Sequence, residues 1–273
     1  MTPAVRPRRY AMTRPTHFDV VYAINPWMTP GTKVDQSLAL EQWGNLKSTY
    51  ESLGHQVDVV EGVPGLPDMV FAANCSTIIG DRAYLSNFRF PERKGETKVY
   101  SSWLKEVGVD IINAEHTNEG EGDFLVLSEV ILAGTGFRTS VEAHVELERA
   151  LGRPVVPLHL VNPSFYHLDV AIAVLDDGLD SGHSRIAYYP GAFSMGSRRT
   201  LQAMFPDAIE VSESEAMAFA LNSVSDGHNV VMPTGAELFA DRVGSAGFNP
   251  IEVELGEFLK AGGSVKCCTL EFH

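Results

Sequence analysis

The sequence has few of the features that mark secreted, membrane-bound or nucleic-acid-binding proteins. Its 273 residues include three cysteines, Cys75, Cys267 and Cys268, and the last two are adjacent. This set is too small for a disulfide framework and indicates a reducing compartment, so we expect a cytoplasmic protein. No run of residues reaches the roughly 18 apolar residues of a transmembrane helix, and the arginine-containing N-terminus lacks the apolar core of a secretory signal.

Positive charge is also scarce. Lysine and arginine number 21 against 35 aspartates and glutamates, which gives a formal net charge of -14. A field of this sign opposes nucleic acid and anionic membranes, so we expect neither as a partner. The 44% hydrophobic content is enough to fill a substantial core and excludes a disordered chain. We expect a frayed, flexible tail over residues 1–13 and a single domain over residues 14–273.

Internal repetition is the main signal for the fold. Five segments each predict a strand, a loop and then a helix, and they begin at Val20, Ala83, Val130, Ile186 and Val230. Four of them follow a predicted hairpin partner. The apolar residues expected on three of the following helices are Leu38, Leu40, Trp43 and Leu46, then Val145, Leu147 and Leu151, and then Leu238, Val243 and Phe248.

The alternation of strands and helices indicates an α/β protein built from five hairpin-and-helix modules. A linear array of such modules needs capping ends, which the sequence does not show, so closure into a ring is favoured. The alternative is an open, doubly wound sheet. The sequence has no GxGxxG turn and no Walker loop after its first predicted strand, which weakens that alternative.

Polar residues that are unusual in strands occur at matching places in successive modules. They are Asn74, Glu119, Glu121, Asp123, His167, Asp169, Asn222 and Cys267. Each alone is typical of a turn or of a hydrogen-bonded structural residue. A ring would direct the whole set toward one axis, and this is why we treat them as a candidate site.

Cys267 is the candidate nucleophile of this set. A cysteine combined with a distant histidine is the arrangement used for thiolate attack with separate acid–base catalysis. We expect Lys266 to favour the thiolate, and we expect strand alternation to turn Cys268 away from the site. Cys75 reads as a small buried residue. Two adjacent cysteines without a nearby histidine pair do not form a zinc site, so we expect no metal.

The charged residues predict the shape of a substrate. Glu119, Asp123 and Asp169 suit a cationic group. Arg93 and Arg138 lie in loops after two of the predicted strands, where a guanidinium can bind a carboxylate with two hydrogen bonds. A small molecule with one cation and one carboxylate has the form of an amino acid.

Six motifs in this order carry a family resemblance: PDMVFAAN, EGEGD, GFRTS, FYHLD, YYPGAF and GGSVKCCTLEF. Together they resemble the guanidino-group-modifying, or pentein, superfamily of arginine deiminases, dimethylarginine dimethylaminohydrolases and amidinotransferases. The similarity runs from about Arg14 to Phe272 and is greatest to a bacterial branch of dimethylargininases and arginine dihydrolases. The resemblance implies a five-bladed α/β propeller without metal or organic cofactor.

The resemblance also implies roles for individual residues. Cys267 matches the nucleophile that forms a thiouronium intermediate, and His167 matches the general acid and base. Glu119 matches the catalytic carboxylate, although the extra residue in EGEGD leaves Glu121 as a competitor. The residues that match substrate contacts are Asp68 and Asp169, with Arg93 and Arg138 as clamps for the α-carboxylate.

Asn74 departs from the pattern, because most relatives have an aspartate there. An amide holds a guanidinium less firmly than a carboxylate does. In arginine dihydrolases the matching asparagine, with a second one matching Asn25, is thought to let a ureido intermediate be attacked again. Asn74 thus favours an arginine dihydrolase, but the general resemblance favours a dimethylargininase that forms citrulline and an amine, and this is our first expectation. The alternatives are an arginine dihydrolase that forms ornithine, an amidinotransferase, and a non-catalytic arginine-binding module, any of which could form a homo-oligomer.

Overall fold

The computed structural model describes residues 5–273. The strands are β1 (Arg9–Thr13), β2 (Gln56–Val60), β3 (Ser76–Ile79), β4 (Arg82–Leu85), β5 (Asp110–Ile112), β6 (Phe124–Val126), β7 (Ile131–Thr135), β8 (Val155–His159), β9 (Ile172–Asp176), β10 (Arg185–Tyr188), β11 (Ile209–Glu210), β12 (Val224–Ser225), β13 (Asn229–Pro233), β14 (Asn249–Val253) and β15 (Leu270–Phe272). The helices are α1 (Gln36–Ser52), α2 (Lys94–Glu106), α3 (Val141–Leu151), α4 (Met195–Met204), α5 (Glu213–Met217), α6 (Glu237–Ser245) and α7 (Gly256–Leu259).

The strands form five units with one pairing pattern. In each unit the first strand is antiparallel to the second, and the second is parallel to the third. The units are β15-β1-β2, β3-β4-β5, β6-β7-β8, β9-β10-β11 and β12-β13-β14. Parallel neighbours need a crossover connection, and α1, α2, α3, α4 and α6 supply it in turn. The predicted α/β class and the four predicted hairpins are confirmed.

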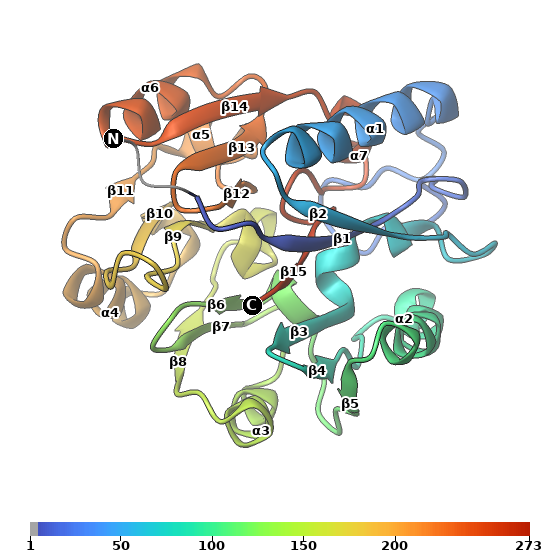
Figure 1. The fold of residues 1–273 in the computed structure, drawn as a ribbon, viewed down its shortest axis with the longest axis horizontal. Helices are drawn as coiled ribbons and strands as arrows, with labels where there is room; N and C mark the ends of the chain where they lie inside the picture. Colours follow the sequence, from blue (N-terminus) through green and yellow to red (C-terminus); the bar gives the residue numbers. More distant parts are fainter. Residues whose placement is uncertain (1–4) are drawn as a thin grey trace.

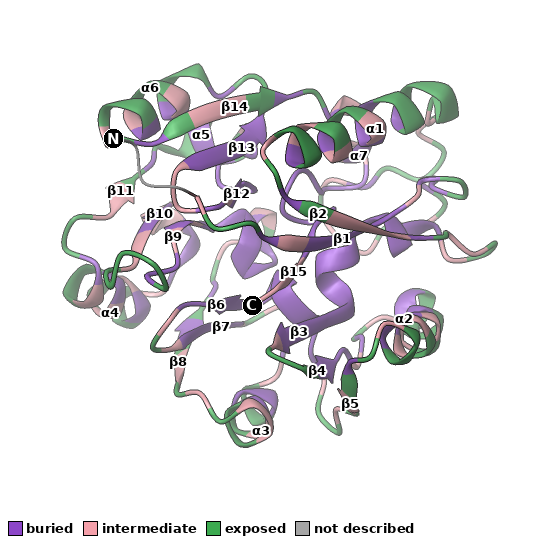
Figure 2. Cartoon of the chain, in the orientation of Figure 1, coloured by how far each residue is buried: buried purple, intermediate pink, exposed green. Residues whose placement is uncertain are grey.

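The sheets are separate, and no closed barrel forms within residues 5–273. A contact between β15 and β3 joins the first two units into a six-stranded sheet, and the other three units are three-stranded sheets. The helices of the units lie toward the outside of the molecule (Figure 1). The burial colours follow this arrangement, because the inner strands are mostly buried and the outer helix faces are exposed (Figure 2). No helix within this range is long and apolar enough to cross a membrane.

The first unit corrects two predictions. The segment that begins at Val20 forms a loop, and the strand of this unit is β1, which includes residues 9–13 of the predicted tail. Tyr10, Ala11 and Met12 are fully buried, and β1 pairs with both β15 and β2. The prediction of a frayed tail is therefore wrong for this strand. Residues 1–4 of the predicted tail lie outside the described residues.

The helices form near the predicted places, but their buried faces differ in part. The Asp35 side chain accepts a hydrogen bond from the Leu38 amide and so begins α1. Trp43 and Leu46 are buried as expected, whereas Leu40 is exposed. Leu38, Val145 and Leu238 are also exposed, and Phe248 lies beyond the end of α6. Helical spacing alone does not say which of two apolar faces meets a sheet.

Candidate active site

Short turns that precede the first strands of the units carry the candidate residues. Asn74 lies in the turn Ala72–Cys75 before β3, and Glu119 comes directly before the turn Gly120–Gly122 and β6. His167 and Asp169 lie at the turn Leu168–Val170 before β9. Cys267 lies in the loop that leads into β15. These turns contact one another, so the repeated unit brings residues from distant parts of the chain together.

One small cavity, lined mostly by buried residues, lies among these turns. Seven of the nine predicted site residues line it, namely Asn25, Asp68, Asn74, Arg93, Arg138, His167 and Cys267. The other two, Glu119 and Asp169, form hydrogen bonds with His167 and Cys267. The cavity wall also includes Phe71 and Tyr166, which the sequence did not identify. Side chains predicted from six separate segments of the chain therefore surround one small space.

Glu119 holds the histidine. Its Oε2 atom lies 2.7 Å from His167 Nε2 and 2.6 Å from Arg138 NH1. Burial alone raises the pKa of Glu119, but the charge of Arg138 and the hydrogen bond from His167 outweigh it and keep the pKa well below its ordinary value. Burial lowers the pKa of His167 to about 4. His167 is therefore neutral at pH 7, donates from Nε2 to an ionised Glu119, and keeps the Nδ1 lone pair free.

Cys267 lies beside a carboxyl group and an amide. Its thiol donates to Asp169 Oδ2 at 3.2 Å, and Asn222 Nδ2 donates to the sulfur at 3.1 Å. Asn222 Oδ1 also accepts the backbone N–H groups of Ser264 and Cys267, which fixes the turn. Burial raises the pKa of the Cys267 thiol well above its ordinary value, and Asp169 raises it further. The Cys267 thiol is therefore neutral at rest.

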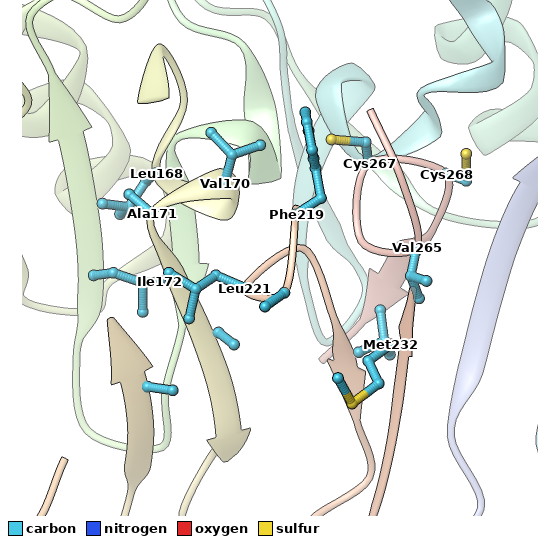
Figure 3. Packing of buried hydrophobic residues seen from close by; sticks show 14 of the residues in the cluster. Leu168, Val170, Ala171, Ile172, Phe219, Leu221, Met232, Val265, Cys267 and Cys268 are labelled. Carbon is cyan, nitrogen blue, oxygen red and sulfur yellow. The ribbon is translucent and has the colours of Figure 1, made fainter. Parts of the chain in front are cut away.

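The adjacent cysteines follow a different geometry from the predicted one. They lie in a turn before β15 and not in a strand, and their side chains leave this turn in different directions beside the hydrophobic cluster (Figure 3). Cys268 is buried, and burial raises the pKa of its thiol above the ordinary value. Only Cys267 of the two lines the cavity.

Lys266 does not act as predicted on the thiol. Its Nζ atom lies 2.6 Å from Glu121 Oε2 and 2.8 Å from Glu271 Oε1. His273 Nε2 lies 3.4 Å from Glu121 Oε1, and we call these four residues the second ionic cluster. Two carboxylates neutralise the ammonium, so the prediction that Lys266 favours a thiolate is wrong. Glu121 bonds to this cluster and not to His167, whereas Glu119 does bond to His167.

The second ionic cluster also contains the one group of potential metal ligands found within residues 5–273. Ligand atoms of Glu121, Glu271 and His273 lie within 4.8 Å of one another. Lys266 already supplies positive charge to both carboxylates. This arrangement fits an internal ion-pair network better than a cation site, because a metal would lie next to the ammonium.

Arg93 is more constrained than its predicted role requires. It donates from Nε and NH2 to the two oxygens of Glu96 at 2.8 Å each, from NH1 to Asn74 Oδ1 at 2.7 Å, and from NH2 to the Asp68 carbonyl at 3.1 Å. Four of its five N–H donors are therefore used within the protein. Glu96 is fully buried. The sequence analysis missed it, although its position three residues after Arg93 at a helix start was a usable signal.

Asn25 closes the cavity from the N-terminal loop. Its Oδ1 atom accepts the backbone N–H of Trp27 at 2.9 Å, and its Nδ2 atom donates to the Ala261 carbonyl at 3.1 Å and to Tyr166 Oη at 3.3 Å. Arg138 donates to the Ile24 carbonyl, one residue away, at 2.7 Å. The amide of Asn25 thus orders the loop as well as lining the cavity.

Several buried polar atoms at this site have no hydrogen-bond partner in the described part of the chain. They are Asp68 Oδ1, His167 Nδ1 and Asp169 Oδ1. Burial raises the pKa of Asp169 to about 7 and also raises that of Asp68. Unpaired buried acceptors are costly, and a ligand with several N–H donors satisfies them. A guanidinium group has that donor set.

The repeated units and this cysteine–histidine–carboxylate site define the class of guanidino-group-modifying enzymes. Comparison with known proteins gives the family within the class. Residues 23–273 match the family model described as N,N dimethylarginine dimethylhydrolase, eukaryotic. The chain belongs to this family.

Two relatives illustrate the family. The N(G),N(G)-dimethylarginine dimethylaminohydrolase of Mycobacterium tuberculosis is 54% identical over 98% of this chain and 87% of its own length. The bifunctional arginine dihydrolase/ornithine cyclodeaminase ArgZ of Synechocystis is 37% identical over 96% of this chain and 37% of its own length. The solved N-terminal domain of ArgZ with bound substrate has a TM-score of 0.91 at 36% identity and covers 97% of each chain.

Proposed function

We propose that the protein is a cysteine-dependent hydrolase of the guanidino carbon of Nω,Nω-dimethyl-L-arginine or L-arginine. One observation carries the proposal. The pairs His167–Glu119 and Cys267–Asp169 meet at a single buried cavity that also has unpaired acceptor atoms. Nucleophile, base and cation-binding groups are the parts that attack on a guanidinium requires.

The first chemical step follows from the charges. A guanidinium beside Asp169 and Cys267 adds positive charge and lowers the pKa of the thiol. His167 accepts the thiol proton at Nδ1, and Glu119 stabilises the resulting imidazolium. The thiolate attacks the guanidino carbon, the proton passes from His167 to the leaving nitrogen, and the departing amine leaves a thiouronium group on Cys267.

The second step releases the product. Water replaces the departed amine and attacks the thiouronium carbon, while His167 Nδ1 takes a proton from it. The carbon–sulfur bond then breaks, the hydroxyl proton of the intermediate passes to the thiolate, and His167 releases its proton to solvent. The product is a ureido amino acid, citrulline. The reaction needs no amine acceptor, which separates it from amidinotransfer.

A second candidate, arginine dihydrolase, is favoured by Asn74. Solved ArgZ domains include one with a cysteine replaced by serine and bound substrate, and one with an asparagine replaced by serine and a covalently bound intermediate. The two replaced residues lie as far apart in that sequence as Asn74 and Cys267 lie here. The 54% identical relative that is named a dimethylarginine dimethylaminohydrolase supports the first candidate.

Product analysis separates these candidates. The purified protein is incubated with L-arginine and separately with asymmetric dimethylarginine, and citrulline, ornithine, ammonia and dimethylamine are measured. Citrulline with dimethylamine, and inert arginine, supports the dimethylargininase. Ornithine with two ammonia per arginine supports the dihydrolase. Binding without any product would contradict both and would leave a non-catalytic arginine-binding module.

We also propose that the five units close into a five-bladed propeller, and that residues 14–273 together with β1 form one catalytic domain in the cytoplasm. The identical strand pairing in all five units and the shared cavity support the first part. The free thiols of Cys75, Cys267 and Cys268 support a reducing compartment.

A further inference from the structure

A buried carboxylate that the proposed reaction does not use lies behind the cavity. Glu96 is in the first turn of α2 and is fully buried. It binds the Arg93 guanidinium with two hydrogen bonds of 2.8 Å, one to Nε and one to NH2. This bidentate contact fixes the plane and the rotation of the guanidinium.

The fixed guanidinium in turn fixes an amide. Arg93 NH1 donates to Asn74 Oδ1 at 2.7 Å. Because arginine has no acceptor, the oxygen of the amide must face Arg93, and its N–H groups must face the other way. Asn74 Nδ2 donates a hydrogen bond to the Glu119 carbonyl at 3.4 Å, so one of its two N–H groups is used within the protein. Gly122 packs against both this nitrogen and His167, since an added Cβ would clash with Asn74 Nδ2 and lie 3.1 Å from His167 Nδ1, so the remaining amide N–H is near the reacting centre.

The orientation of the Asn74 amide distinguishes two kinds of ligand. A guanidinium carries only N–H donors, so it offers nothing for the amide N–H to bind. A ureido group has a carbonyl oxygen, which accepts such a hydrogen bond. A site with a fixed donor rejects a ligand that lacks the matching acceptor more strongly than apolar contacts do. The fixed amide therefore favours the ureido group over the guanidinium.

We propose that Glu96 is a positioning residue that acts through Arg93 to hold Asn74 as a hydrogen-bond donor for the ureido oxygen. This inference rests on the proposed function and deepens it. In this role Glu96 controls how tightly citrulline binds relative to arginine. It therefore also affects whether the ureido product dissociates or stays bound and is attacked again. Glu96 contacts neither ligand itself.

The test measures binding without turnover. In a Cys267→Ala background, dissociation constants of L-citrulline and L-arginine are measured by calorimetry with and without Glu96→Gln. The glutamine keeps the shape but loses one acceptor for Arg93, which lets the Asn74 amide turn. We expect citrulline to bind about tenfold more weakly and arginine to change less than about twofold. Glu92→Gln, an exposed change two residues before Lys94, is the matched control and changes neither constant.

An equal loss for both ligands, or no loss, overturns the inference. With Cys267 intact, the share of ornithine or the retention of citrulline should fall in Glu96→Gln, whereas a purely structural role would lower the total rate at a constant product ratio. If Glu96→Gln does not fold, Glu96→Asp keeps the charge but shortens the reach, and the same change in binding ratio is expected. Absence of product from the unmodified enzyme would instead overturn the proposed function.

Discussion

The cavity site and the second ionic cluster are built from neighbouring residues of the same short segments. They differ in how completely their buried charges are paired. Glu119 and Cys267 belong to the cavity, while Glu121 and Lys266 belong to the second ionic cluster. In the second cluster one ammonium binds two carboxylates at 2.6 and 2.8 Å. At the cavity, Asp169 and His167 each keep an unpaired atom, whereas in the second cluster Glu121 Oε1 lacks a hydrogen bond but lies 3.4 Å from His273 Nε2.

The difference shows what each cluster does. A buried charge with its partners present holds segments together, and removal of one partner leaves an uncompensated charge. A buried acceptor without a partner lowers stability and suits a ligand. The second cluster therefore joins the turn at Gly120–Gly122 to the turn that bears Cys267, and the unpaired atoms of the cavity suit a ligand.

The largest expected effect distinguishes the two adjacent cysteines. Cys267→Ala removes the nucleophile and should lower kcat by about 10⁴-fold or more, since a group that forms a covalent bond has no substitute. Cys268→Ala, the matched control, should keep most of the activity. Citrulline release from arginine and from dimethylarginine measures both. The reverse pattern would disprove the assignment of the nucleophile.

The next effect separates the two glutamates. Glu119→Gln should lower kcat about 10²- to 10³-fold, because the His167 imidazolium loses its counter-charge. Glu121→Gln should lower the free energy of unfolding by about 3 kcal/mol with little change in kcat, because it leaves Lys266 with one carboxylate fewer. Steady-state kinetics and urea unfolding of both variants provide the check. A larger loss of kcat in Glu121→Gln would mean that the clusters are assigned the wrong way round.

The third effect concerns pH. Burial raises the pKa of Asp169 to about 7, so the folded state binds its proton more firmly than the unfolded state does. Its contribution to stability is present at acid pH and is lost as the pH rises through about 7. Asp169→Asn should therefore raise the free energy of unfolding at both pH values. The increase should be about 2–3 kcal/mol larger at pH 8 than at pH 5. An equal change at both pH values would contradict this account.

The second cluster should show the opposite dependence. Burial raises the pKa of Glu271, but Lys266 together with His273 and Arg8 outweighs burial and lowers the pKa below the ordinary value. The stabilisation that Glu271 provides is present at pH values above the pKa that Glu271 has in the unfolded chain, and it is lost as the pH falls. The loss of unfolding free energy in Glu271→Gln should be constant from pH 5 to pH 8 and should become smaller in stronger acid. The same urea series, extended to lower pH, measures it.

The smallest effect tests Asn74. Asn74→Asp restores a carboxylate at the cavity and should lower the KM for arginine several-fold, because a carboxylate binds a guanidinium more firmly than an amide does. It should also shift the products toward citrulline. Asn45→Asp, a change at an exposed position of α1, serves as the control. An unchanged ratio of ornithine to citrulline would count against a role for Asn74 in the choice of product.

Local patterns predicted much of this fold. Four of five module strands and all four hairpins were predicted, because alternating apolar residues and Gly or Asp turns act over a few residues. β1 was missed, because its arginine-containing flanks resemble a solvated tail and only pairing with β15 and β2 buries it. The exposure of Leu38 and Leu238 was also missed, because only tertiary packing decides which face of a helix is buried.

The sequence by itself determined the class of fold, the set of residues with reactive or charged side chains, and the kind of ligand they suit. These depend on residue type and on short-range order. The tertiary structure alone decided which of two glutamates meets His167, that Lys266 is neutralised by Glu121 145 residues away, and that Glu96 holds Arg93 against Asn74. The physical reason is that the charge state of a buried group depends on the atoms around it, and folding brings those atoms from distant parts of the chain.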